Sequence, residues 1–430
     1  MSDFGPVGGA VASVAGAAPA VVEMQADHNL ADGDRVRIGT ASSGAALLYF
    51  AKCKGYPANT FGVYSDVGLK AAASLDGVQA GMGVVKLAFE DYAIVAGINT
   101  YPSYSSLKGP VADARRFVKW LKESAFVPDD QVRPVVSPAS PPARLEDAQP
   151  KLDEISGEFV RLARLAYKKD LYRVGRRLYV FLSGHGILPT RTGAPDFNES
   201  ALLMANTDQA SLGYHLGGNA YAEWFRTAGV FDEVVLFMDC CRDWKDNVAL
   251  TPPAMPPIKP QRDAARRFYA AATQLDSKSW ERPFGTPPEI CGVFSHVLME
   301  ALESQLCDAN GLLTGQVLAG QLYKEVPALQ NNQLPDISYK PEFDIVFARR
   351  TPPAVLQARV TFGPALQGQQ IELLGGSKYP NPDETHLASA VPWIVKPLKK
   401  GLYQLRAPNT GAIKYVSVDG KQEVLDVDFS

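Results

Sequence analysis

Two apolar runs, each about the length of one strand, end at reactive side chains and constrain this chain more than any other feature. The run RRLYVFLSGHG delivers His185, and the run DEVVLFMDCCRD delivers Cys240 and Cys241 directly after Asp239. The carboxyl ends of parallel strands form the crevice in which open α/β sheets bind ligands. His185 and Cys241 can therefore meet there, although they lie 56 residues apart in the sequence. A cysteine beside a histidine is the arrangement of a thiol nucleophile with its base.

Strand-like and helix-like segments alternate from Asp91 onward, which is typical of a mainly parallel sheet covered by helices on both faces. DYAIVAGINTY is almost wholly apolar, as a strand covered on both faces requires. SLKGPVADARRFVKWLKE then repeats apolar residues at helical spacing. Further expected elements are VRPVVS, the helix LDEISGEFVRLARLAYKK, the histidine strand, SALLMANTD, the helix AYAEWFRTAG, the cysteine strand, FYAAATQ, the helix GVFSHVLMEALES, and DIVFARR, which we expect to close the sheet.

In these motifs the chain resembles the caspase, paracaspase and metacaspase group of cysteine peptidases. A histidine lies about 50 residues before the nucleophile in caspases. Ser-Gly-His-Gly matches the group's histidine motif, and Asp239-Cys240-Cys241-Arg242 is closer to the metacaspase pattern than to the caspase pattern. The resemblance covers Asp91 to Arg349. It implies a caspase-like fold and an endopeptidase that hydrolyses a protein or peptide substrate through an acyl-enzyme intermediate.

The resemblance implies that Cys241 is the nucleophile and His185 its general base. A thiol must lose its proton before it can attack a carbonyl, and an imidazole is the usual acceptor. The backbone N–H groups of Gly186 and Cys241 are the expected oxyanion-hole donors. Neighbouring strand residues point to opposite faces, so only one of the two cysteines can face the histidine. Cys240 then packs as a small hydrophobe. The alternative for these motifs is a core histidine and a buried cysteine pair.

Asp239 and Asp113 are the expected substrate-binding residues. In metacaspases the aspartate two residues before the nucleophile lines the first specificity pocket, and a second aspartate joins it from the turn after the first strand. Two carboxylates would hold Arg or Lys through charge-assisted hydrogen bonds, whereas caspases use arginines to hold aspartate. Asp113 could instead be an acid favoured by the macrodipole at a helix N-terminus. A non-catalytic protein that keeps the fold as a scaffold is the alternative function, and the intact motifs favour the enzyme.

The stretch TPPAMPPIKPQRDAARR, which follows the cysteine strand, is expected to be a proline-rich linker. Caspase-like zymogens are often cut in this interval, and exposed linkers are suited to nicking. Arg262, Arg266 and Arg267 match the basic preference expected of the pocket. We therefore expect self-cleavage after one of them. The alternative is that these arginines only solvate a surface linker.

Regions on both sides of the expected peptidase domain, residues 89–350, are β-like. Residues 1–21 are rich in Ala, Gly and Val, and we expect a flexible tail. Residues 22–88 are expected to form a small β module, since short strand-like runs alternate with turn residues. This module faintly resembles small β repeats of phage tail proteins, which implies a docking or spacer role for a regulatory partner. Residues 351–430 contain six strand-like runs and are expected to form a small antiparallel sandwich.

Composition excludes several classes of partner and compartment. The chain has 43 basic and 46 acidic residues and no basic block, which argues against nucleic acid. Its five cysteines do not form a disulfide framework, which favours a reducing, cytoplasmic location. The first 22 residues lack the basic region of a signal peptide, and no apolar run approaches membrane-spanning length. We therefore expect a protein that is not bound to a membrane.

No cofactor or metal is required by the expected chemistry. Metacaspases often bind calcium through an acid-rich loop near the histidine, but ILPTRTGAPDFNES offers only Asp196 and Glu199, so calcium dependence is not expected. His386 lies in an expected loop and lacks metal-ligand spacing. Cys53, Cys291 and Cys307 have no partner pattern and are expected to be structural or incidental.

Overall fold

The computed structural model divides the chain between Thr351 and Pro352 into two units. The residues that it describes are 5–15, 19–26, 30, 34–39, 47–64, 83–88, 90–140, 142, 144–168, 173–190, 199–256, 264–350, 356–375, 381–398, 401–418 and 424–430. The first unit contains a β-barrel and the α/β region, and the described residues of the second form strands and one short 3₁₀ turn.

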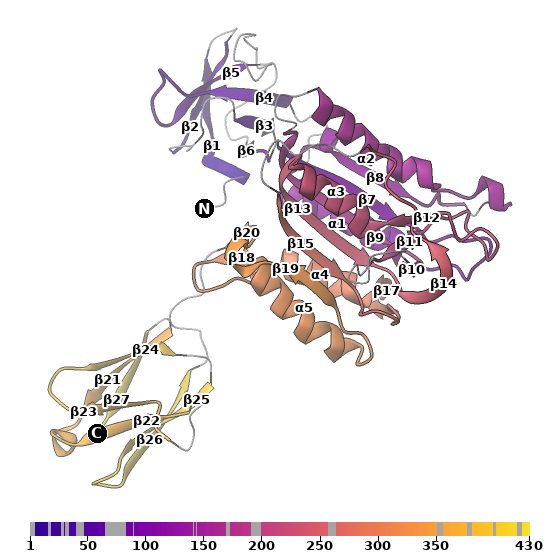
Figure 1. Cartoon of the computed structure of the whole chain (residues 1–430). Helices are drawn as coiled ribbons and strands as arrows, with labels where there is room; N and C mark the ends of the chain where they lie inside the picture. The colour runs from indigo at the N-terminus through magenta and orange to yellow at the C-terminus, as the bar shows by residue number, and fades with distance from the viewer. Residues whose placement is uncertain are drawn as a thin grey trace. The chain divides into compact units, whose positions relative to one another are not determined.

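A six-stranded sheet forms the centre of the α/β region, in the order β19-β15-β13-β9-β7-β8 (Figure 1). Every neighbouring pair is parallel except β15 with β19, which confirms the mainly parallel sheet expected from the sequence. The strands are β7 (Asp91–Gly97), β8 (Val132–Val136), β9 (Gly175–Ser183), β13 (Phe231–Asp239), β15 (Arg266–Ala271) and β19 (Asp336–Tyr339).

Helices cover both faces of this sheet, as expected (Figure 1). Alternate residues of β9 supply the two cores, because successive strand side chains point to opposite faces. Phe181 stacks on Phe117 of α1 with 4.9 Å between ring centroids, while Leu178, Val180 and Leu182 belong to the core on the other face. One core is covered by α1 (Pro110–Glu123), α4 (Val293–Glu303) and α5 (Gly315–Leu329), and the other by α2 (Leu152–Tyr167) and α3 (Gly218–Ala228). Within the described residues no helix has both the length and the apolar character needed to cross a bilayer.

The edge of the central sheet differs from the sequence-based expectation. DIVFARR does not close the sheet, because its strand β20 (Val346–Arg349) pairs instead with β18 (Leu312–Thr314). The edge is β19, whose four residues are only partly buried. Because β19 pairs on one side only, its sequence contains no long apolar run. The apolar pattern of DIVFARR therefore predicted the wrong edge strand. The helix α5 was also not predicted.

The N-terminal strands close into a barrel in the order β1-β2-β5-β4-β3-β6. The expected flexible tail is wrong for β1 (Gly5–Ala15), which pairs with both β2 and β6 and buries Val11. Small uncharged residues resemble a linker in composition, whereas barrel closure gives this strand partners on both sides. The other barrel strands are β2 (Val21–Met24), β3 (Arg35–Gly39), β4 (Leu47–Lys52), β5 (Thr60–Tyr64) and β6 (Gly83–Lys86).

The second unit packs two sheets around one core, in the orders β24-β21-β27 and β23-β22-β25-β26. The expected arrangement was wholly antiparallel, but β21 and β27 pair in parallel. His386 lies in β23 rather than in a loop, and its ring stacks on Trp393 with 4.9 Å between centroids. The strands are β21 (Leu356–Phe362), β22 (Gln370–Leu374), β23 (Glu384–Leu387), β24 (Trp393–Leu398), β25 (Gly401–Ala407), β26 (Ala412–Val418) and β27 (Val424–Phe429).

Candidate active site

The two sequence motifs lie side by side at the carboxyl ends of β9 and β13. The last register pair of these parallel strands is Ser183 with Asp239, and His185 and Cys241 each lie two residues further on. The N–H of Gly184 donates to the carbonyl of Asp239 at 3.2 Å, which ties the two ends together where the strands stop. The shared register therefore places the imidazole and the thiol at the same edge of the sheet.

The segments that follow β9 and β13 enter a second, four-stranded sheet, whose order is β12-β11-β10-β14. β10 (Gly186–Thr190) begins directly after His185, and β14 (Asp243–Ala249) begins two residues after Cys241. These two strands are again parallel, with Ile187 opposite Asp243. The remaining strands are β11 (Ala201–Leu203) and β12 (His215–Gly217). Both catalytic candidates thus lie in short breaks between two paired stretches of strand.

Four predicted site residues line one cavity of about 370 Å³: His185, Cys241, Asp113 and Asp239. Cys241 enters it from β13, and Asp113 comes from the first turn of α1. Gly186, the predicted oxyanion-hole residue, is buried, and a Cβ on it would lie 2.7 Å from the Sγ of Cys240. The rest of the lining consists of Ser105, Leu107, Pro110, Ser183, Gly184, Asp243, Lys278, Ser279, Trp280, Glu281 and Gly292.

The two adjacent cysteines occupy different environments. Cys240 is 1% exposed and belongs to a hydrophobic core, whereas Cys241 is partly exposed in the cavity. The thiol of Cys241 donates to the carbonyl of Ser279 across 3.7 Å. Burial raises the pKa of Cys241 above its usual range. The resting thiol therefore holds its proton at neutral pH and needs a base to become a nucleophile.

His185 is held by contacts that the sequence did not reveal. Its Nε2 lies 2.7 Å from the backbone carbonyl of Ser105. A carbonyl only accepts, so Nε2 carries the proton and Nδ1 keeps the lone pair. The backbone N–H of His185 donates to the Tyr101 hydroxyl at 2.9 Å, and the two rings meet edge to face with 4.7 Å between centroids. These contacts fix the tautomer and orientation of a potential general base.

Asp239 and Asp113 are buried carboxyls at the base of the cavity. Asp239 accepts hydrogen bonds from the Ser279 hydroxyl at 2.5 Å and from the backbone and side chain of Ser295 at 3.0 and 2.6 Å. Asp113 accepts one from the backbone N–H of Gly292 at 2.9 Å. Burial raises the pKa of both carboxyls, and the charge of Asp239 raises that of Asp113 further. Neither carboxyl forms an ion pair within the described residues, although Lys278 also lines the cavity.

A third acid, Glu281, lines the same cavity and was missed from the sequence. It is the first residue of β16 (Glu281–Phe284), which pairs with β17 (Glu289–Gly292). Its carboxylate accepts the backbone N–H of Gly109 at 2.7 Å. Gly292 ends this hairpin, and a Cβ there would lie 2.1 Å from the Asp239 carboxylate. No local pattern marks Glu281, because only the folded hairpin brings it to the acids.

The model of the caspase domain family matches residues 90–339. The chain belongs to the caspase-domain family. Two solved structures share similarity with it at 14% identity and a TM-score of 0.38. The first is a protein from Geobacter sulfurreducens, and the match covers 97% of that protein and 61% of this chain. The second is pro-sf-caspase-1, and the match covers 93% of that protein and 62% of this chain. No curated protein matches this chain.

The other predicted residues of the caspase domain that the structure describes do not line the cavity. Arg266 and Arg267 are not in a linker, because they begin β15 and contact Glu233 and Glu223, respectively. Arg262 and Asp196 lie outside the described residues.

Glu199 is buried and accepts the N–H groups of Asn219 and Ala220 at the start of α3, and burial raises its pKa to about 8. A capping role therefore explains Glu199 better than a calcium ligand does. The described residues contain no group of three side chains suited to a metal.

The environments of the two cysteines predict their reactivity toward iodoacetamide in the resting protein. Because burial raises the pKa of Cys241, its alkylation should still accelerate, by up to about tenfold per pH unit, as the pH rises through 9. Cys240 should stay unmodified until the protein unfolds. Mass spectrometry of the modified peptides measures each site separately. A rate for Cys241 that levels off below pH 8 would show that a thiolate–imidazolium pair already exists in the resting site.

Proposed function

We propose that this caspase-domain protein is a metacaspase-type cysteine endopeptidase that cleaves peptide bonds after Arg or Lys. The observation that carries the proposal is that one cavity holds a thiol, an oriented imidazole and buried carboxyls. The first two are the requirements of a thiol nucleophile, and the carboxyls are the requirement of a pocket for a basic side chain. The family match is consistent with this chemistry.

In the proposed reaction, Nδ1 of His185 takes the proton of Cys241 and the thiolate attacks the scissile carbonyl carbon. The backbone N–H groups of Gly186 and Cys241 are proposed to stabilise the oxyanion. The amine leaves with the proton returned from His185, and a thioester remains on Cys241. Water, deprotonated by the same imidazole, then hydrolyses the thioester and regenerates the thiol. The Ser105 carbonyl stabilises the imidazolium because it already accepts the Nε2 proton.

The acids in the cavity support a preference for a basic side chain. Burial disfavours the charged forms of Asp113 and Asp239, so a cationic side chain that enters the cavity would stabilise both carboxylates. A guanidinium presents several donors in a planar fork and can meet more than one carboxylate. Asp113, Asp239 and Glu281 together offer such acceptors. An acidic or neutral side chain would leave the buried carboxyls without that compensation.

The proposed pairing of Cys241 with His185 predicts different activities for three variants. Cys241→Ala and His185→Ala should each lower kcat/KM for a fluorogenic Arg-ending peptide by at least about 1,000-fold, because the two groups act as a unit. Cys240→Ala should keep activity within about threefold, since this side chain packs in the core. Loss of activity in Cys240→Ala with full activity in Cys241→Ala would reverse the assignment. Wild-type protein that cleaves no basic peptide would favour the scaffold role.

The specificity pocket predicts that charge, rather than shape, decides the preference. The ratio of kcat/KM for Arg-ending over citrulline-ending peptides should fall by about 10- to 100-fold in Asp239→Asn, which keeps the shape but removes the charge. Glu325→Gln, at a partly exposed position of α5 outside the cavity lining, is the control and should leave the ratio unchanged. The wild-type ratio should also fall as the pH drops through the raised pKa values of Asp113 and Asp239, because the carboxyls become neutral. An unchanged ratio in Asp239→Asn would exclude this pocket.

Self-cleavage in the interval after β14 is proposed to be dispensable for activity. β14 is already paired with β10 in the uncut chain, so the segment after the nucleophile is ordered without a cut. Cleavage after Arg266 or Arg267 would break β15, which pairs with both β13 and β19. Arg262 therefore remains the proposed cleavage position of the three.

Intact-mass measurement of the purified protein tests this proposal. Wild type should be cut after Arg262, and Cys241→Ala should stay whole because the cut is its own reaction. Arg262→Gln should stay whole and keep at least about half of the wild-type activity, since the single chain already has the paired β10 and β14. An uncut Arg262→Gln protein without activity would show that cleavage is required.

A further inference from the structure

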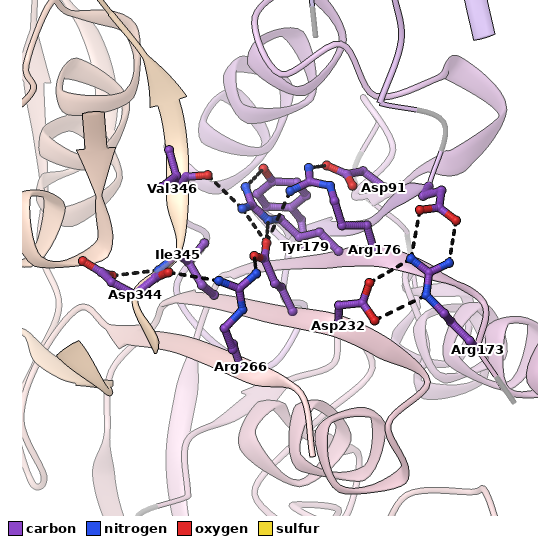
Figure 2. A network of polar contacts seen from close by, with 12 residues as sticks. Asp91, Arg173, Arg176, Tyr179, Asp232, Arg266, Asp344, Ile345 and Val346 are labelled. Atoms are coloured by element: carbon purple, nitrogen blue, oxygen red, sulfur yellow. Dashed lines mark hydrogen bonds and ion pairs between the residues drawn. The ribbon is translucent and has the colours of Figure 1, made fainter. Parts of the chain in front are cut away.

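A second cavity, of about 540 Å³, lies at the opposite end of the central sheet. It is formed by the amino ends of β7, β9, β13 and β15, together with β20 and the end of α1. Figure 2 shows the polar groups there, with Asp91, Arg176, Tyr179 and Arg266 pointing toward one another. The catalytic candidates lie at the carboxyl ends of the same strands, so the two cavities are separate sites.

Arginines dominate this cavity, and most are held in place by Glu233. The Glu233 carboxylate accepts from Arg177 at 2.5 Å, from Arg176 at 3.4 Å and from Arg266. Arg177 is 2% exposed and also donates to the Tyr179 hydroxyl at 2.7 Å and to the Val346 carbonyl at 2.8 Å. These bonds fix the guanidinium groups before any ligand arrives, which lowers the entropic cost of binding.

The described lining carries more positive than negative charge. It contains five arginines but only three carboxylates, those of Asp91, Glu123 and Glu233. Arg350 has no carboxylate partner among the described residues, and burial lowers its pKa. Its Nε is buried without a hydrogen-bond partner, while its Nη2 donates to the Leu302 carbonyl. A desolvated cation with an unused donor is costly unless an anion accepts from it.

Arg173, at the same end of the sheet, is an arginine whose charge is fully paired with acidic side chains. Its guanidinium pairs with Glu90 at 2.5 Å and with Asp232 at 2.8 Å (Figure 2). Arg173 is not part of the cavity lining. Two acids thus satisfy this single cation. Arg350, which has no carboxylate partner among the described residues, instead lines the cavity.

We propose that this cavity binds a small ligand that carries a phosphate group, with Arg350 as its main cationic contact. The planar fork of an arginine matches the oxygens of a phosphate. The volume lies within the range of small-molecule sites and exceeds the space that a bare phosphate needs. The buried Oδ1 of Asp91, which has no partner within the described residues, is available to accept from a hydroxyl or amine of the same ligand.

Isothermal titration of the full chain with inorganic phosphate, at constant ionic strength in chloride, tests the proposal. Wild type should bind one phosphate, and Arg350→Gln should bind at least about tenfold more weakly. Arg115→Gln is the matched control, because Arg115 is exposed on α1 and lies outside the cavity lining. No binding to wild type, or equal binding to Arg350→Gln and wild type, would overturn the proposal.

A second pair of variants keeps the test decisive if Arg350→Gln fails to fold. Ser124 is exposed at the end of α1 and lines the cavity. Ser124→Glu should weaken phosphate binding and Ser124→Lys should strengthen it, since only the sign of the added charge differs. Identical affinities in these two variants would place phosphate elsewhere. A parallel titration with succinate tests whether the ligand is a carboxylate instead. If succinate binds at least as tightly as phosphate, the phosphate assignment is overturned.

Discussion

The parallel pairing of β9 with β13 is the constraint on which the rest of the candidate site depends. Ser183 faces Asp239 in the last register pair, so His185 and Cys241 leave the sheet at the same level. A slip of one residue would turn every side chain of β13 to the other face. Cys240 would then enter the cavity and Cys241 the core. Both faces of β13 are buried in hydrophobic cores, so such a slip would exchange its side chains between the two cores and disrupt the packing of both.

The two ends of the central strands differ in the charge of the side chains gathered there. At the carboxyl ends, Asp113 and Asp239 form no ion pair within the described residues, and burial raises the pKa values of both. At the amino ends, arginines outnumber the acids around a second cavity. Charged groups at strand ends can be fixed by hydrogen bonds to backbone and hydroxyl groups without entering the apolar cores. This arrangement would allow one sheet to hold the two proposed sites, which would select ligands of opposite charge.

The parts of the site that short strings of sequence encode could be predicted, and the parts that long-range contacts create could not. His185, Cys241, Asp239 and Asp113 each follow from a local motif. The Ser105 carbonyl that orients His185 is a backbone group, which any residue type would supply. Glu281 reaches the cavity only because β16 pairs with β17. At the level of the fold, long apolar or amphipathic elements were predicted, whereas β1 and β19 depend on partners distant in the sequence.

The separate surroundings of Cys240 and Cys241 also determine how the protein responds to oxidants. Of these two, Cys241 is the accessible thiol, so peroxide would convert it to a sulfenic acid before it reached Cys240. A resolving thiol must reach that sulfur with disulfide geometry, and Cys240 is buried against Gly186 in the core. The neighbouring cysteine therefore offers no internal rescue. Recovery of an oxidised Cys241 therefore depends on a thiol other than Cys240, such as glutathione, and without one the damage proceeds to irreversible acids.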